Sequence, residues 1–451
     1  MRKTKPGWKL AIAILSLLLT AWVWQKGLQE SFQRPSVGPR LSLRQNEMAL
    51  MASPSLPEAI KPILVGLDPS LSLKGVIQEI PLEAMTAKEK IVLASLERSK
   101  EDRTLLLKEN IQDQSLETIR KKLLIKDPDK LEISRFFIDL KEKNIDPVVY
   151  RVSCNALSGD PKVCIDNKVS KLIALRLGIS QLLPFSASLL GVLLLIRELW
   201  KFLRKKNNNW PALTSLPLSL LDMVLLVSGG FVVLGEVVFP AFAVPLIDQA
   251  TKHFSSPLNE CLKVLFGYVV MTLPPLFILR KQLKSLDNTS IPLGGWLQWK
   301  VQPLGEAILK AIRGWLMIMP LVLLTGFLMN NFVGDQGGSN PLLDLVLRSH
   351  EPLPLTLLLF TTVVLAPFFE ELIFRGALLP ALVDKFGRSW GIGISALVFA
   401  LAHLSVGELP PLFVLGIGLA ILRLSSGRLM PCALMHSLWN GITFSNLLLL
   451  G

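Results

Sequence analysis

Long apolar runs constrain this chain more than any other feature of its sequence. Most are about long enough to cross the roughly 30 Å hydrocarbon core of a bilayer as a helix, and several are shorter or hold internal prolines. After Arg176 they occupy residues 177–196, 218–239, 264–279, 314–332, 353 into an acidic motif, 390–406, 411–422 and 429–450. With an anchor at residues 10–24, they predict an all-α polytopic membrane helix bundle of about nine transmembrane helices.

The composition supports this fold class and limits the function. Of the 451 residues, 51% are hydrophobic and only 18% are charged, whereas a soluble domain of this size is normally more polar. A formal charge of +13 would suit a nucleic-acid partner, but Lys and Arg flank the apolar runs and no nucleic-acid motif accompanies them. The basic residues therefore indicate membrane topology and lipid contact.

Four segments are predicted along the chain. Residues 1–25 form a transmembrane anchor, because basic residues precede an apolar run that lacks a signal-peptide cleavage pattern. Residues 26–176 have mixed charge and apolar residues at steps of three and four, which predicts a mostly helical extramembrane domain. Residues 177–340 carry transmembrane helices, and residues 341–451 form a core that carries three motifs.

Basic clusters lie at alternate ends of the predicted spans. They are the amino terminus, residues 197–206, residues 280–284, Lys385 with Arg388, and Arg423 with Arg428. The positive-inside rule places these ends in the cytoplasm and residues 26–176 on the opposite side. An oxidising compartment there would allow a disulfide between Cys154 and Cys164, and two unrelated thiols are the alternative.

The first motif, "EELIFR", puts three charges into an apolar span. Each costs about 2.5 to 3.5 kcal/mol at the centre of a spanning helix. Glu371 and Arg375 are four residues apart with the acid first, so they can form a helical ion pair. Glu370 is left without a partner at helical spacing on its own segment. An unpaired carboxylate in such a place is suited to general-base catalysis.

The second and third motifs place imidazoles in later spans. His403 lies in "FALAH", four residues after Phe399, and His436 lies in "HSLWN", four residues before Asn440. An unpartnered polar ring is costly in lipid, so both histidines should face the bundle interior. Fixed N–H donors on His436 and Asn440 are of the kind that stabilise an oxyanion when a carbonyl is attacked.

These three segments resemble the EExxxR, FxxxH and HxxxN motifs of the CPBP family, which contains the CAAX prenyl proteases of the Ras-converting type and the bacteriocin-processing, Abi-like proteins. The resemblance covers about the last hundred residues and does not extend to residues 1–170. It implies an intramembrane glutamic endopeptidase that acts on a membrane-associated protein, of which prenylated CAAX proteins are the best-known examples. No cofactor is implied.

The resemblance also implies roles for the motif residues. Glu370 would activate water with the assistance of His403, and His436 with Asn440 would stabilise the oxyanion. Glu371 and Arg375 would hold the first motif in place, and Phe399 would support His403.

Several alternatives remain open at this stage. Glu370, His403 and His436 would make a catalytic zinc site of two histidines and one carboxylate, although no HExxH sequence is present. A catalytically idle membrane scaffold or immunity protein would need no chemistry from these residues. A transporter would show similarly interrupted helices in both halves, and that pattern is not evident. Each polar residue taken separately could also form only an interhelical hydrogen bond.

Overall fold

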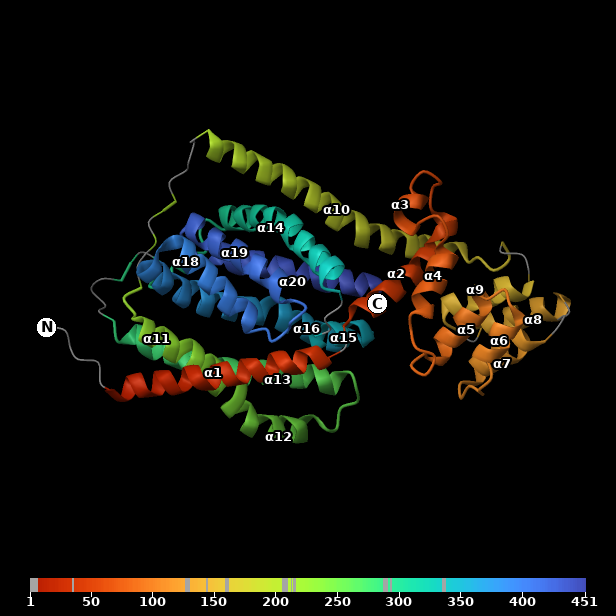
Figure 1. Cartoon of the computed structure of the whole chain (residues 1–451), viewed down its shortest axis with the longest axis horizontal. Coiled ribbons are helices and arrows are strands. Elements are labelled where there is room, and N and C mark those ends of the chain that lie inside the picture. Colours follow the sequence, from red (N-terminus) through yellow and green to blue (C-terminus); the bar gives the residue numbers. More distant parts are fainter. Residues whose placement is uncertain are drawn as a thin grey trace. The chain divides into compact units, whose positions relative to one another are not determined.

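The computed structural model describes residues 7–34, 36–125, 130–142, 145–158, 162–204, 210–211, 213, 216–286, 291–292, 294–334 and 338–451. Most of its α-helices are labelled in Figure 1. No β-strand occurs among these residues. The helices divide into two compact units, residues 38–184 with Leu450 and a bundle unit made of the remainder. The four segment boundaries predicted from the sequence stay predictions.

The 38–184 unit consists of short helices. They are α2 (Gly38–Ala52), η1 (Ser53–Ser55), α3 (Lys61–Val65), α4 (Pro69–Gln78), α5 (Ala87–Leu96), α6 (Lys100–Leu106), α7 (Gln114–Leu124), α8 (Lys130–Glu142), α9 (Pro147–Ser158) and the first part of α10 (Asn167–Leu203). Asp68 caps α4 and Asp113 caps α7 through their carboxylates, while Thr86 and Glu89 form a capping box at α5. These caps satisfy amide groups that the short helices leave unpaired.

An apolar core holds these short helices together. Leu73, Ile91, Ile119, Phe137 and Val149, each from a different helix, are nearly or fully buried within it. Next to this core, a disulfide joins Cys154 to Cys164. The disulfide confirms the pairing that the sequence left open.

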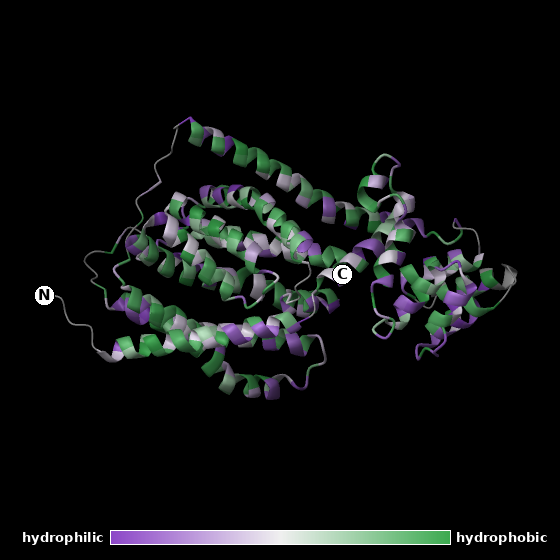
Figure 2. Cartoon of the chain, in the orientation of Figure 1, coloured by the Kyte–Doolittle hydropathy of each residue, from purple (hydrophilic) through white to green (hydrophobic). Residues whose placement is uncertain are grey.

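The bundle unit contains the long helices. They are α1 (Gly7–Gln33), the second part of α10, α11 (Leu220–Val224), η2 (Leu225–Val238), α12 (Phe239–Thr251), α13 (Leu258–Lys284), α14 (Leu304–Phe332), α15 (Pro341–Arg348), α16 (Pro352–Leu359), η4 (Phe360–Leu365), α17 (Ala366–Glu371), η5 (Leu372–Leu378), α18 (Leu379–Leu401), α19 (Leu409–Ser426) and α20 (Met430–Leu450). In Figure 2, hydrophobic residues predominate along α10, whereas hydrophilic and hydrophobic residues are mixed along α5 to α9.

Seven helical runs among the described residues are long and apolar enough to cross a membrane: Gly7–Ser55, Asn167–Leu203, Leu220–Thr251, Leu258–Lys284, Leu304–Phe332, Pro352–Leu401 and Leu409–Ser426. The predicted all-α polytopic fold is therefore confirmed, and the protein is an integral multi-pass membrane protein. The number of nine helices stays a prediction. The two counts differ for two reasons. First, α20 is not among the seven runs. Second, Pro352–Leu401 is a single helical run that is kinked at Gly387 (φ 80°), whereas the sequence predicted two spans there.

Close helix packing in the bundle unit depends on small residues. In lipid, helices associate through van der Waals contact and hydrogen bonds, and small side chains let their backbones approach. Gly416 of α19 lies against Ala396 of α18, so that an added Cβ would be 3.0 Å from the Ala396 Cα. Around this contact, aromatic and aliphatic side chains from several helices form a continuous core that includes Phe231, Trp315, Phe374, Phe399, Leu419 and Met435.

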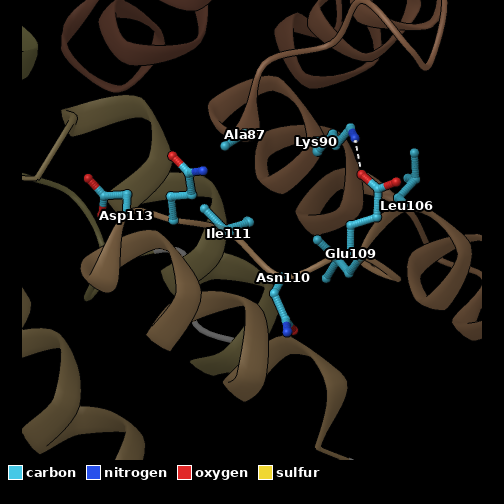
Figure 3. A pocket seen from close by; sticks show the side chains of 9 residues that line it. Ala87, Lys90, Leu106, Glu109, Asn110, Ile111 and Asp113 are labelled. Carbon is cyan, nitrogen blue, oxygen red and sulfur yellow. Dashed lines mark hydrogen bonds and ion pairs between the residues drawn. The ribbon is translucent and has the colours of Figure 1, made fainter.

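A loop of the 38–184 unit is fixed by one buried arginine. Arg120 donates to both carboxylate oxygens of Glu117 at 2.7 and 2.8 Å, to the Leu107 carbonyl at 2.7 Å and to Asn110 Oδ1 at 2.8 Å. Glu117 also accepts from the backbone N–H of Ile111 at 2.9 Å. The loop held in this way lines a cavity of about 290 Å³, and Figure 3 shows its lining side chains.

The Glu117 interactions predict a pH-dependent stability. The hydrogen bond from Arg120, helped by that from Ile111, lowers the pKa of Glu117 from 4.5 to about 2. A lowered carboxyl pKa stabilises the fold fully above pH about 4.5, and this contribution is lost as the pH falls towards 2. We therefore expect Glu117→Gln to lower amide hydrogen-exchange protection over residues 107–124 at neutral pH, with the difference from the wild type shrinking as the pH falls.

Glu109→Gln is the matched control. Glu109 is 80% exposed and pairs with Lys90 at the surface, and such pairs contribute about 0 to 1 kcal/mol. Equal loss of protection in the two variants at neutral pH would contradict a specific role for Glu117.

Candidate active site

A buried ion pair anchors the first motif. Glu371 ends α17 and Arg375 lies in the π-helix η5, and both side chains are fully buried. Arg375 Nη1 donates to Glu371 Oε1 at 2.9 Å, the pairing that their four-residue spacing predicts. Removing one partner of such a pair leaves an uncompensated buried charge and typically costs about 3 to 5 kcal/mol.

The same pair connects the first motif to two other helices. Arg375 Nη2 donates to the Gly416 carbonyl of α19 at 3.2 Å, and Arg423 Nε of α19 donates to the Arg375 carbonyl at 3.2 Å. From α20, His436 Nδ1 lies 3.0 Å from Glu371 Oε1. A carboxylate only accepts hydrogen bonds, so Nδ1 of His436 carries the proton and Nε2 is directed elsewhere.

Glu370 lies beside this network and faces both histidines. Its Oε2 is 3.9 Å from Nε2 of His403 and 3.9 Å from Nε2 of His436. Its Oε1 accepts a hydrogen bond of 3.2 Å from the Tyr268 hydroxyl of α13. The Glu370 side chain is 14% exposed, and the three motifs therefore meet at a partly buried carboxylate.

His403 is oriented by the end of α18. This helix stops at Leu401, so His403 lies in the following turn rather than inside the span predicted for residues 390–406. Its backbone N–H bonds to the Ala400 carbonyl, and Nδ1 lies 2.8 Å from the Phe399 carbonyl. Because a carbonyl must accept, Nδ1 carries a proton and Nε2 is the nitrogen presented to Glu370.

Phe399 forms a shared wall behind the site. Its ring centroid is 4.7 Å from that of His403 and 5.7 Å from that of His436, in edge-to-face arrangements. The Arg375 guanidinium lies 4.2 Å from the same ring, a distance at which cation–π attraction operates. One fully buried side chain thus limits the movement of both imidazoles and of the arginine.

Asn440 makes a contact that its sequence position did not reveal. Its Nδ2 donates to the Thr362 carbonyl at 2.8 Å. Thr362 lies in η4, which is a π-helix like η5, and η4 and η5 flank α17 on either side. Single π-turns inside helices occur often at functional sites. The amide of Asn440 has two N–H donors, and one of them is used in this contact.

Sequence reasoning missed Tyr268 and Gly416, and it used Arg423 only as part of a basic cluster. Tyr268 is one of only two tyrosines in the chain, and a phenol in an apolar helix normally needs a hydrogen-bond partner. That argument could have identified it as a candidate, although not its partner. Arg423 donates to a backbone carbonyl of another helix, and Gly416 accepts from Arg375 through its own backbone carbonyl, so neither contact leaves a local pattern.

The zinc alternative involves Glu370, His403 and His436, which lie near one another in the site. Within the described ranges, no group of three or more His, Cys, Asp or Glu side chains is placed so that it could hold a metal ion. A catalytic zinc site stays an alternative hypothesis.

Comparisons with known proteins identify two segments. Residues 38–175 match a family described as a domain of unknown function, DUF8675. Residues 352–442, which contain all three motifs, match the family described as type II CAAX prenyl endopeptidase Rce1-like. No curated protein and no solved structure matches the chain.

The second match confirms the family resemblance predicted from the motifs and supports a CAAX-type intramembrane protease in general. The chain thus carries, at residues 352–442, a segment of the Rce1-like family of type II CAAX prenyl endopeptidases.

Proposed function

We propose that this protein is an intramembrane endopeptidase that hydrolyses a peptide bond of a membrane-associated protein through water activated by Glu370. The observation that carries the proposal is the position of Glu370 Oε2, 3.9 Å from Nε2 of both His403 and His436. Each imidazole is fixed at its other nitrogen, His403 by the Phe399 carbonyl and His436 by Glu371.

The separation of 3.9 Å favours a water-mediated arrangement. It is too long for a direct hydrogen bond, and polar groups at such distances are commonly bridged by water. A water held between Glu370 and His403 would have its proton acceptor on α17 and its orienting group in the turn after α18. General-base catalysis of this kind contributes about 10² to 10⁴ in rate.

The reaction would proceed in two steps. Glu370 takes a proton from the water as its oxygen attacks the carbonyl carbon, and the carbonyl oxygen becomes an oxyanion. That proton, passed from Glu370 or through His403, then reaches the amide nitrogen as the C–N bond breaks. The products are a new carboxyl terminus and a new amine. The remaining N–H of Asn440 and Nε2–H of His436 would stabilise the oxyanion.

The charges near the site are of both signs. Glu370 and Glu371 are acidic, and Arg375 and the buried Arg423 are basic. Buried charges are tolerated when they are paired and hydrogen-bonded. The proposal requires that Nε2 of His436 carries a proton when the oxyanion forms, because only an N–H can donate to it.

We infer the class of substrate from the family match, and the orientation of the protein in the membrane from its basic loops. A membrane protease acts on membrane-associated substrates, and a prenylated CAAX-type protein is the narrower class suggested by the family description. We place the amino terminus and the basic loops in the cytoplasm by the positive-inside rule. The disulfide between Cys154 and Cys164 supports placing residues 26–176 in an oxidising compartment on the opposite side.

Replacing the proposed base should stop cleavage without unfolding the protein. We expect Glu370→Gln to lower the rate at least about 10²-fold, because the amide cannot take the proton. Substrates would first be identified by comparing the amino termini of membrane proteins in cells that express the wild type and in cells that express the variant. A terminus that appears only with the wild type marks a cleavage site. Cleavage of one such substrate in proteoliposomes would then give the rate.

Glu236→Gln is the matched control. Glu236 lies in η2 and also has a buried carboxylate oxygen, but it belongs to none of the motifs. We expect it to retain wild-type cleavage, and a Glu370→Gln variant as active as this control would reject the proposed base.

A metal chelator in the same assay distinguishes the glutamate mechanism from a zinc mechanism. If the chelator abolishes wild-type cleavage and added zinc restores it, a zinc mechanism is favoured.

Tyr268 should act by positioning Glu370. We expect Tyr268→Phe to reduce kcat by about tenfold to a hundredfold, since a hydrogen bond to a charged group contributes about 1.5 to 3 kcal/mol. Adding Tyr268→Phe to the Glu370→Gln variant should cause no further loss of activity, because the carboxylate that Tyr268 positions is then absent. Full activity of Tyr268→Phe, or an equal loss in both backgrounds, would contradict this role.

A further inference from the structure

The 38–184 unit exposes large aliphatic side chains around α3 and the start of α4. Ile63 is 75% exposed and Leu67 is 96% exposed, and Ile60 and Leu71 are exposed as well. We call these four residues the apolar edge. These residues lie close together in the sequence, and exposed apolar patches on a protein surface often mark contact with a membrane or a partner.

The buried side of α3 belongs to an apolar cluster that also includes α2 and α10. Leu64 and Val65 of α3 are buried in this cluster with Ala174 and Leu177 of α10. The cluster lies within the 38–184 unit. It places α3 near residues 174–177 of α10, and the position of α10 relative to a bilayer can be inferred from its sequence.

The membrane boundary on α10 falls at the same level. Lys168, Lys171 and Arg176 are the charged residues in the first part of the helix, and the next charge along it is Arg197. The uncharged stretch between Arg176 and Arg197 spans about 30 Å, the thickness of the hydrocarbon core. One surface of the bilayer should therefore cross α10 near Leu177, which belongs to the same apolar cluster as Leu64 and Val65 of α3.

We propose that the apolar edge docks on the lipid bilayer, with Ile63, Leu67 and Leu71 at the boundary between headgroups and acyl chains. Apolar side chains at that depth leave water, as those of an interfacial helix do. Exposed Leu172 and Leu175 on α10 lie close to the same level and extend the apolar surface. This inference does not depend on the proposed protease activity.

Environment-sensitive labels test the docking in the full chain. Leu67→Cys carrying a nitrobenzoxadiazole label, reconstituted in phosphatidylcholine vesicles, should show blue-shifted emission and quenching by a lipid with a nitroxide near its headgroup. Ile63→Cys should behave in the same way. Cys261 and Cys432 are buried, so the labelled unsubstituted protein measures the background.

Leu105→Cys is the matched control, because Leu105 is 64% exposed on α6 of the same unit and is not a member of the apolar cluster that contains Leu64, Val65 and Leu177. Its label should resist the nitroxide lipid and be quenched by aqueous iodide. Docking is overturned if the Leu67 label is quenched by iodide as strongly as the control. It is also overturned by a blue shift without nitroxide quenching, which would show that protein rather than lipid covers the edge.

Discussion

The buried pair of Glu371 and Arg375 is the interaction on which the rest of the site depends. Neither charge is tolerable alone inside an apolar bundle, so each needs the other and the groups around them. Arg375 reaches the Gly416 carbonyl, and Glu371 accepts from His436. The need to neutralise two charges therefore fixes the first motif against α19 and α20.

The orientation of the reacting groups follows from that anchor. Glu371 holds Nδ1 of His436, so Nε2 must face Glu370. The helix end at Leu401 frees the Phe399 carbonyl for Nδ1 of His403, and its Nε2 faces the same carboxylate. The Phe399 ring packs against both imidazoles. Preorganised groups of this kind need little reorganisation during a reaction.

Local patterns in the sequence predicted some of these features, and long-range packing determined the others. The all-α membrane fold and the pairing of Glu371 with Arg375 follow from apolar length and from helical spacing. Tyr268 and the Thr362 carbonyl could not be assigned as partners, because each contact joins residues far apart in the chain. The number of spans was uncertain because length and hydropathy alone do not show where a long helical run bends, as this one does at Gly387.

In the proposed mechanism, side chains from three carboxyl-terminal segments surround one hydrated carboxylate. An experimental structure in lipid nanodiscs, at a resolution that shows ordered water, would test this arrangement. We expect a water molecule within hydrogen-bonding distance of Glu370 Oε2 and of an imidazole Nε2. A Glu370 carboxylate that points into lipid, or is separated from both imidazoles by packed aliphatic side chains, would contradict it.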